Sequence, residues 1–97
     1  MKKYYHATDF ENLIPILDEG LKVGPDGIVY LTETPEDALK FVMLRGLKSI
    51  LVIEVEVEEG KVEEQFDHNY NFFKCKAYGH DGDICTGQCT NFTKYEL

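Results

Sequence analysis

Residues 4–21, with the sequence YYHATDFENLIPILDEGL, join a predicted strand to a predicted helix. The strand runs from Lys3 to His6. Thr8 and Glu11 have the spacing of a capping box, in which each side chain satisfies a backbone N–H of the first helical turn. Polar side chains therefore lie where a strand ends and unpaired helical N–H groups begin, an arrangement that often forms a binding site.

The pattern of this first helix predicts one buried face. Apolar residues recur at three- and four-residue spacing, at Phe10, Leu13, Ile14 and Leu17. Gly20 can adopt the left-handed conformation that ends a helix. Pro15 lacks an N–H and clashes with the preceding turn, so we expect a kink or an irregular start.

A second strand and helix follow with the same order. Ile28 to Thr32 is rich in β-branched and aromatic residues, which favours a strand. The next four residues, 34–37, read TPED and predict a helix start, because threonine caps, proline fits the first position and acids face the positive helix end. Gly46 should end this helix. His6 and Tyr30 therefore each lie near the end of a strand that leads into a helix.

The C-terminal half is predicted to be mostly β. Ser49 to Glu58 is the strongest strand and should be central, because apolar residues alternate with glutamates after a continuous apolar run. Further strands are expected at Val62–Phe66, Tyr70–Tyr78 and Asn91–Tyr95, with a loop at Gly79–Asp83. These elements predict an α+β fold in which two short N-terminal helices pack on a split, mainly antiparallel sheet. A chain of 97 residues supports one core, so residues 1–97 should form a single domain.

Charge and composition limit the partners. The formal net charge of -8 argues against a broad surface for nucleic acid or anionic membrane, and a basic protein surface fits better. The start of the chain lacks the apolar core of a signal peptide, and no apolar run reaches the length of a membrane span. Three cysteines form a poor disulfide framework. We therefore expect a cytoplasmic protein without membrane contact.

Several short motifs carry a family resemblance. They are Tyr5-His6-Ala7-Thr8, Asn12-Leu13, Ile16, Gly20-Leu21, Gly27-Ile28-Val29-Tyr30-Leu31-Thr32 and Pro35-Glu36-Asp37-Ala38. Over about the first 45 residues, this pattern resembles the N-terminal half of the ADP-ribosyltransferase-like superfamily. The similarity is to its small bacterial and phage members, and to the group that holds the RNA 2'-phosphotransferases and the DNA ADP-ribosyltransferase toxins. The resemblance implies that fold, with NAD as substrate and a protein or nucleic acid as target.

The resemblance also implies roles for individual residues. His6 matches a histidine that hydrogen-bonds the ribose next to nicotinamide, and Thr8 matches a polar residue in the same loop. Tyr30 matches the aromatic residue against which nicotinamide packs, and Thr32 follows it. Cleavage of the glycosidic bond of NAD develops an oxocarbenium ion, so the site needs a ribose anchor, an aromatic wall and a carboxylate.

The identity of the carboxylate is the open point in this interpretation. The family places a glutamate on a late strand, and the chain offers Glu63, Glu64, Asp67 and Asp83. Asp67 is favoured because it opens the predicted strand to Tyr78 within a polar group of residues, 67–69. Arg45 is the only arginine and lies near the end of the second helix. Its position argues against the 2'-phosphotransferase activity.

Two other functions stay open from the sequence. An acidic, non-catalytic inhibitor could use the same scaffold against a basic protein, for instance one carried by a phage or mobile element against a host defence system. A zinc-stabilised interaction module is the other, because Cys75, His80, Cys85 and Cys89 together supply a tetrahedral ligand set. Their spacing is not that of a standard zinc knuckle. Cys75 could instead be a buried strand residue, and the other two cysteines loop thiols.

Each candidate site residue also has a structural alternative. His6 could tie the first loop to a neighbouring strand, Tyr30 could be a half-buried core wall, and Asp67 with His68 could form an ordinary turn.

Overall fold

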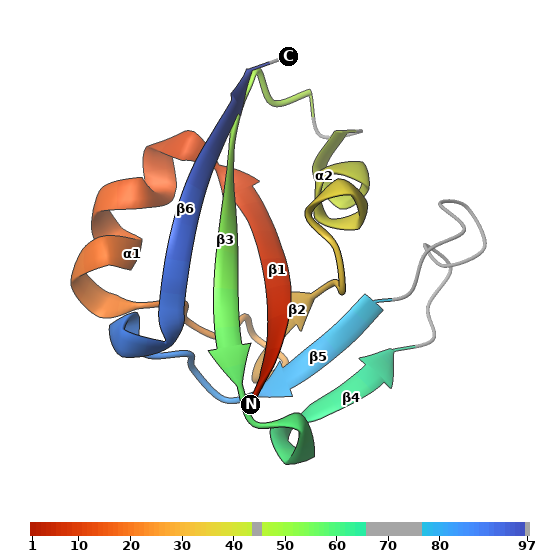
Figure 1. Cartoon of the computed structure of the whole chain (residues 1–97). Helices are drawn as coiled ribbons and strands as arrows, with labels where there is room; N and C mark the ends of the chain where they lie inside the picture. Colours follow the sequence, from red (N-terminus) through yellow and green to blue (C-terminus); the bar gives the residue numbers. More distant parts are fainter. Residues whose placement is uncertain (44–45, 66–76, 97) are drawn as a thin grey trace.

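The computed structural model describes residues 1–43, 46–65 and 77–96, and it has an α+β fold (Figure 1). These residues form two antiparallel sheets of three described strands each, ordered β1-β3-β6 and β2-β5-β4. The elements are β1 (Lys2–Asp9), a 3₁₀ turn (Phe10–Asn12), α1 (Leu13–Glu19), β2 (Ile28–Leu31), α2 (Pro35–Met43), β3 (Ser49–Val57), a 3₁₀ turn (Glu59–Lys61), β4 (Val62–Gln65), β5 (Ala77–Asp81), a 3₁₀ turn (Thr86–Gln88) and β6 (Cys89–Glu96). The coarse fold class predicted from the sequence is confirmed.

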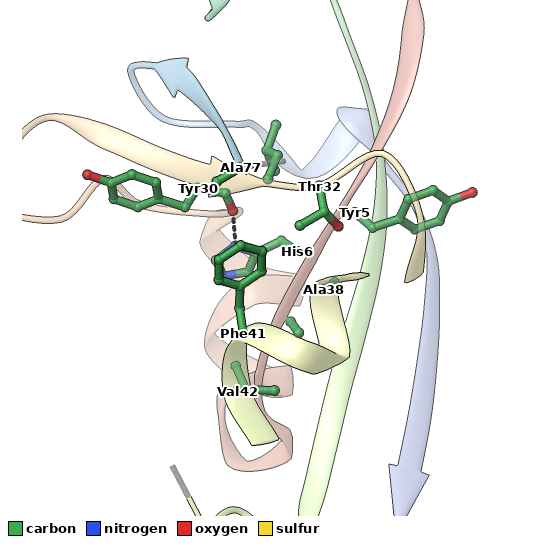
Figure 2. A pocket seen from close by; sticks show the side chains of 10 residues that line it. Tyr5, His6, Tyr30, Thr32, Ala38, Phe41, Val42 and Ala77 are labelled. Atoms are coloured by element: carbon green, nitrogen blue, oxygen red, sulfur yellow. Dashed lines mark hydrogen bonds between the residues drawn. The ribbon is translucent and has the colours of Figure 1, made fainter. Parts of the chain in front are cut away.

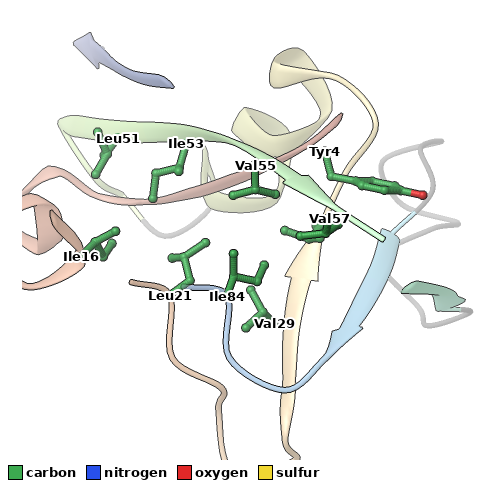
Figure 3. Close-up of a cluster of buried hydrophobic side chains, with 10 residues drawn as sticks. Tyr4, Ile16, Leu21, Val29, Leu51, Ile53, Val55, Val57 and Ile84 are labelled. Carbon is green, nitrogen blue, oxygen red and sulfur yellow. The ribbon is translucent and has the colours of Figure 1, made fainter. Parts of the chain in front are cut away.

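The central strand β3 has buried side chains on both of its faces. On one face, the apolar side chains of β3 pack with α1 and with the second sheet, and Figure 3 shows them pointing towards Ile16, Leu21 and Ile84. On the other face, Ile50 and Val52 pack against Val42 of α2. Figure 1 accordingly shows α1 and α2 on opposite sides of the first sheet. The predicted central position of this strand is confirmed.

The first helix begins differently from the prediction. The capping box of Thr8 and Glu11 is wrong, because β1 continues to Asp9, whose Oδ1 accepts from the Glu11 backbone N–H at 3.0 Å. The Thr8 hydroxyl instead accepts from Asn12 Nδ2 at 2.8 Å. A 3₁₀ turn follows and places Pro15 in the first turn of α1, where its missing N–H costs little. The expected irregular start is therefore confirmed.

The predicted apolar face of α1 is only partly buried. Ile16 is buried, and Phe10 and Leu13 pack against the core from partly buried positions. Ile14 and Leu17, however, are 70% and 50% exposed. The core therefore covers a narrower part of α1 than the sequence pattern predicts.

The helix α2 and the strands β4 and β6 follow the prediction where the structure describes them, whereas most of the strand predicted at Tyr70–Tyr78 lies outside the described residues. Thr34 Oγ1 caps α2 by accepting from the Asp37 N–H at 3.1 Å. The loop predicted at Gly79–Asp83 is wrong in its first part, because β5 extends to Asp81. Pairing with both β2 and β4 makes β5 the centre of the second sheet and keeps it extended. Among the described residues, no helix combines the length and apolar character that crossing a membrane requires.

A cluster of polar and aromatic side chains joins the two sheets near the start of β1. Tyr78 Oη donates to Glu33 Oε1 at 2.8 Å, and Lys2 Nζ donates to Glu33 Oε2 at 2.9 Å. The rings of Tyr78 and Tyr4 have centroids 5.4 Å apart. Burial of the phenol, followed by its bond to Glu33, raises the pKa of Tyr78 above its ordinary value of 10.0.

This raised pKa predicts a loss of stability at alkaline pH. The folded state holds the phenolic proton of Tyr78 more tightly than the unfolded state does. The stabilisation is therefore complete below pH 10.0 and is lost as the pH rises through the higher folded pKa. We expect Tyr78→Phe to flatten the fall in urea midpoint between about pH 10 and about pH 12, measured by circular dichroism. A variant profile as steep as that of the wild type would rule out Tyr78 as the titrating group.

Candidate functional site

A cleft of about 290 Å³ lies beside the edge of β1. The outer edge of β1 forms one side, α2 forms a second and the second sheet forms a third. Its lining is mostly apolar and comprises Tyr5, His6, Ala7, Tyr30, Leu31, Thr32, Ala38, Phe41, Val42 and Ala77 (Figure 2). The structure thus brings together His6, Tyr30 and Thr32, three of the residues predicted from the sequence to form the site.

A hydrogen bond to a backbone carbonyl fixes the ring of His6. Its Nδ1 lies 2.7 Å from the carbonyl oxygen of Tyr30 (Figure 2). Because a carbonyl oxygen only accepts, this hydrogen-bond network assigns the proton of neutral His6 to Nδ1. Nε2 is then the acceptor nitrogen of the ring. His6 therefore ties β1 to β2 through its Nδ1.

The backbone of Ala7 presents a donor and an acceptor beside this histidine. The N–H and C=O of Tyr5 both bond to Thr32, at 2.8 Å each, so they point away from β3. Alternate residues of an antiparallel strand direct their backbone groups to the same side. Ala7 is two residues further along β1 and lines the cleft, so its N–H and C=O also point to this outer edge.

The aromatic side chain on the His6 side of the cleft comes from α2 and not from β2. Figure 2 shows the Tyr30 ring extending away from His6 and Phe41, and its hydroxyl donates to Asp26 Oδ2. That bond is the main reason why the pKa of Asp26 is lowered. Phe41 projects from α2 on the side of His6 (Figure 2). Its role as a cleft residue was not predicted, because an apolar helix residue carries no local signal that separates a cleft position from a core position.

The two threonines predicted at the site differ in position. Thr8 is not among the residues that line the cleft, and its hydroxyl is bonded to Asn12. Thr32 does line the cleft but is only 4% exposed, and its hydroxyl donates to the Thr34 carbonyl at 2.7 Å. Thr8 therefore ties the end of β1 to the turn that follows, and Thr32 supports the backbone before α2.

The predicted carboxylate, Asp67, lies outside the described residues. In sequence it is two residues beyond Gln65, whose partner across β4 and β5 is the cleft residue Ala77. Among the other candidates, Asp83 accepts from the Val23 N–H at 2.8 Å and so has a structural role. Glu63 and Glu64 lie on β4, opposite Gly79 and Tyr78.

The structure describes three of the four predicted zinc ligands, and Cys75 lies outside the described residues. His80 is 2% exposed, and its Nδ1 is 2.9 Å from the Gly82 carbonyl oxygen. Cys85 Sγ donates to Gln88 Oε1 at 3.2 Å, and Cys89 Sγ to the Cys85 carbonyl at 3.6 Å. Within residues 1–43, 46–65 and 77–96, no three histidine, cysteine or acidic side chains are grouped around a metal position. The zinc site stays a prediction.

The two described thiols should differ in reactivity. Cys85 is exposed, whereas Cys89 is partly buried, and burial raises the pKa of the Cys89 thiol. Since the thiolate is the nucleophile, iodoacetamide at about pH 8 should alkylate Cys85 several-fold faster than Cys89. Peptide mass mapping over time measures both rates. Equal rates would contradict the burial of Cys89, and protection of both thiols by added zinc would favour a metal site.

Comparison with known proteins identified no relative of this chain among protein-family models or curated proteins.

Proposed function

We propose that the cleft binds the nicotinamide and adjoining ribose of NAD, and that the protein is a compact ADP-ribosyltransferase with the fold of that superfamily. The observation that carries the proposal is the grouping of His6, Ala7 and Phe41 around one small apolar cleft. Each of the three offers a different interaction that this half of NAD requires. The target would be a macromolecule, and a basic protein surface fits the net charge of -8 better than nucleic acid does.

The size of the cleft suits part of the dinucleotide. Pockets that enclose drug-sized ligands have volumes of roughly 300–1,000 Å³. At about 290 Å³ this cleft would take an aromatic ring and part of a sugar. The rest of the NAD molecule would lie outside it.

The polar groups in the cleft complement the nicotinamide riboside chemically. The carboxamide of nicotinamide has one N–H side and one carbonyl side, which matches the acceptor and donor of the Ala7 backbone. A ribose hydroxyl can donate to His6 Nε2, because Nδ1 is already bonded to the Tyr30 carbonyl. The ring of Phe41 offers a flat apolar surface for the nicotinamide.

For the proposed reaction, the protein must orient NAD and place one carboxylate near the ribose. The bond between ribose C1' and the nicotinamide nitrogen breaks, and its electron pair leaves with neutral nicotinamide. The positive charge that develops on the ribose is stabilised by a carboxylate, for which we propose Asp67. The nucleophile of the target then bonds to C1' and releases its proton to solvent or a base.

Nicotinamide release from NAD tests this proposal, with a basic protein such as histone as acceptor. We expect release with the wild type and its loss in His6→Ala and Asp67→Ala. If NAD neither binds nor turns over with the wild type in the presence of candidate targets, the proposed enzyme function is wrong.

A non-catalytic binding protein on the same scaffold is the second candidate. The excess of acidic over basic residues favours it, since the chain has 18 Asp and Glu residues but 10 Lys and Arg residues. Such a protein would inhibit a basic partner, for instance as a phage or mobile-element product that acts on a host defence system. It would keep its inhibitory binding when His6 is replaced, which separates it from the enzyme.

A further inference from the structure

The helix α1 has an exposed apolar shoulder that the core does not use. Around the helix, Leu13, Ile16 and Gly20 face the interior, and Leu17 and Ile14 follow on the next side. Ile14 is 70% exposed and Leu17 is 50% exposed. At three residues apart they are neighbours on the helix surface. The apolar stripe of α1 is therefore wider than its contact with the rest of the fold.

Acidic side chains border this shoulder. Glu11, in the 3₁₀ turn before α1, is three residues before Ile14, and Asp18 is four residues after it, so both lie beside Ile14. The carboxylates of Glu11 and Asp18 are exposed, and neither forms an ion pair with a residue that the structure describes. Residues 9–21 contain no lysine or arginine. The shoulder thus has two carboxylates without an ion-pair partner at the edge formed by Ile14.

We propose that this shoulder of α1 is a docking surface for a protein with an apolar groove bordered by lysine and arginine side chains. An amphipathic helix that inserts spaced apolar anchors into a groove is a common mode of recognition. Charge complementarity selects a basic border, because an acidic one would repel the carboxylates of Glu11 and Asp18. Figure 1 shows α1 on the opposite side of the first sheet from α2, which forms a wall of the cleft. A partner on α1 would therefore leave the cleft open.

Photo-crosslinking in the cells that naturally express the chain tests this inference. The probe is p-benzoylphenylalanine, placed at position 14 or 17 of the full chain. Met43 serves as the control position, because it is also apolar and is 56% exposed but lies on α2. We expect positions 14 and 17 to give the same adduct with one basic protein, and position 43 not to give it. No shared adduct, or an equal adduct from position 43, would overturn the proposal.

The affinity of the purified partner for this chain then tests the role of the carboxylates beside the shoulder. A variant with Glu11→Gln and Asp18→Asn keeps the size of each side chain and removes its charge. We expect its Kd for the crosslinked partner to be weaker by about tenfold or more, with thermal stability retained. An unchanged Kd would overturn the proposal. His6→Asn should give the same adduct as the wild type, so this result does not depend on the proposed NAD chemistry.

Discussion

Gly20→Ala is expected to lower the free energy of unfolding by about 3–5 kcal/mol, a large part of the stability of a domain of this size. Gly20 has a φ of 80°, where a side chain is strained. A Cβ at this position would lie 2.3 Å from the carbonyl oxygen of Ile84, which is a backbone atom and cannot rotate away. The adjoining Leu21 pairs with Ile84 through both backbone groups, so relief would break that bridge.

Gly27→Ala is the matched control for this substitution. Its φ of 76° is nearly the same, but a Cβ there would meet nothing within 4 Å. It should therefore cost only the conformational strain, about 1 kcal/mol. Urea unfolding followed by circular dichroism measures both variants. Equal losses in the two would contradict the close packing of Gly20 against Ile84.

His6→Asn is expected to reduce nicotinamide release by a factor on the order of 10² while leaving the fold intact. The side-chain amide of asparagine can place its N–H where Nδ1 of His6 donates to the Tyr30 carbonyl. It has no atom at the position of Nε2, so the proposed acceptor for the ribose hydroxyl is lost. The substitution therefore separates the structural bond of His6 from its proposed contact with the ligand.

Two comparisons make this result interpretable. His6→Ala removes both the structural bond and the acceptor, so it should lower the thermal midpoint as well as activity. His6→Asn should keep the midpoint of the wild type. If His6→Asn releases nicotinamide at the rate of the wild type, His6 only ties β1 to β2.

The secondary structure could largely be predicted from the sequence because its signals are local. The proline and acids after Thr34 define the start of α2, and the alternation after Ser49 defines the central strand. The cap at the start of the first helical segment was predicted wrongly because Thr8 and Asp9 are both good capping residues. Which of them caps depends on how far β1 pairs with β3, and that pairing joins residues about 40 positions apart.

The site could be predicted less completely because its geometry comes from contacts between distant segments. His6 was recognised from its motif, but its bond to the Tyr30 carbonyl depends on how the two sheets meet. The orientation of the Ala7 backbone follows from the Tyr5–Thr32 bridge, and no local pattern encodes it. Phe41 carried the same signal as any apolar helix residue. The functions predicted for His6, Tyr30 and Asp67 stay predictions.

A crystal structure with a carbocyclic NAD analogue, which cannot be cleaved, tests the proposed function most directly. We predict that the carboxamide bonds to the backbone of Ala7, that a ribose hydroxyl donates to His6 Nε2 and that the nicotinamide packs on Phe41. The dinucleotide bound elsewhere, or an empty cleft at saturating analogue, would contradict the account.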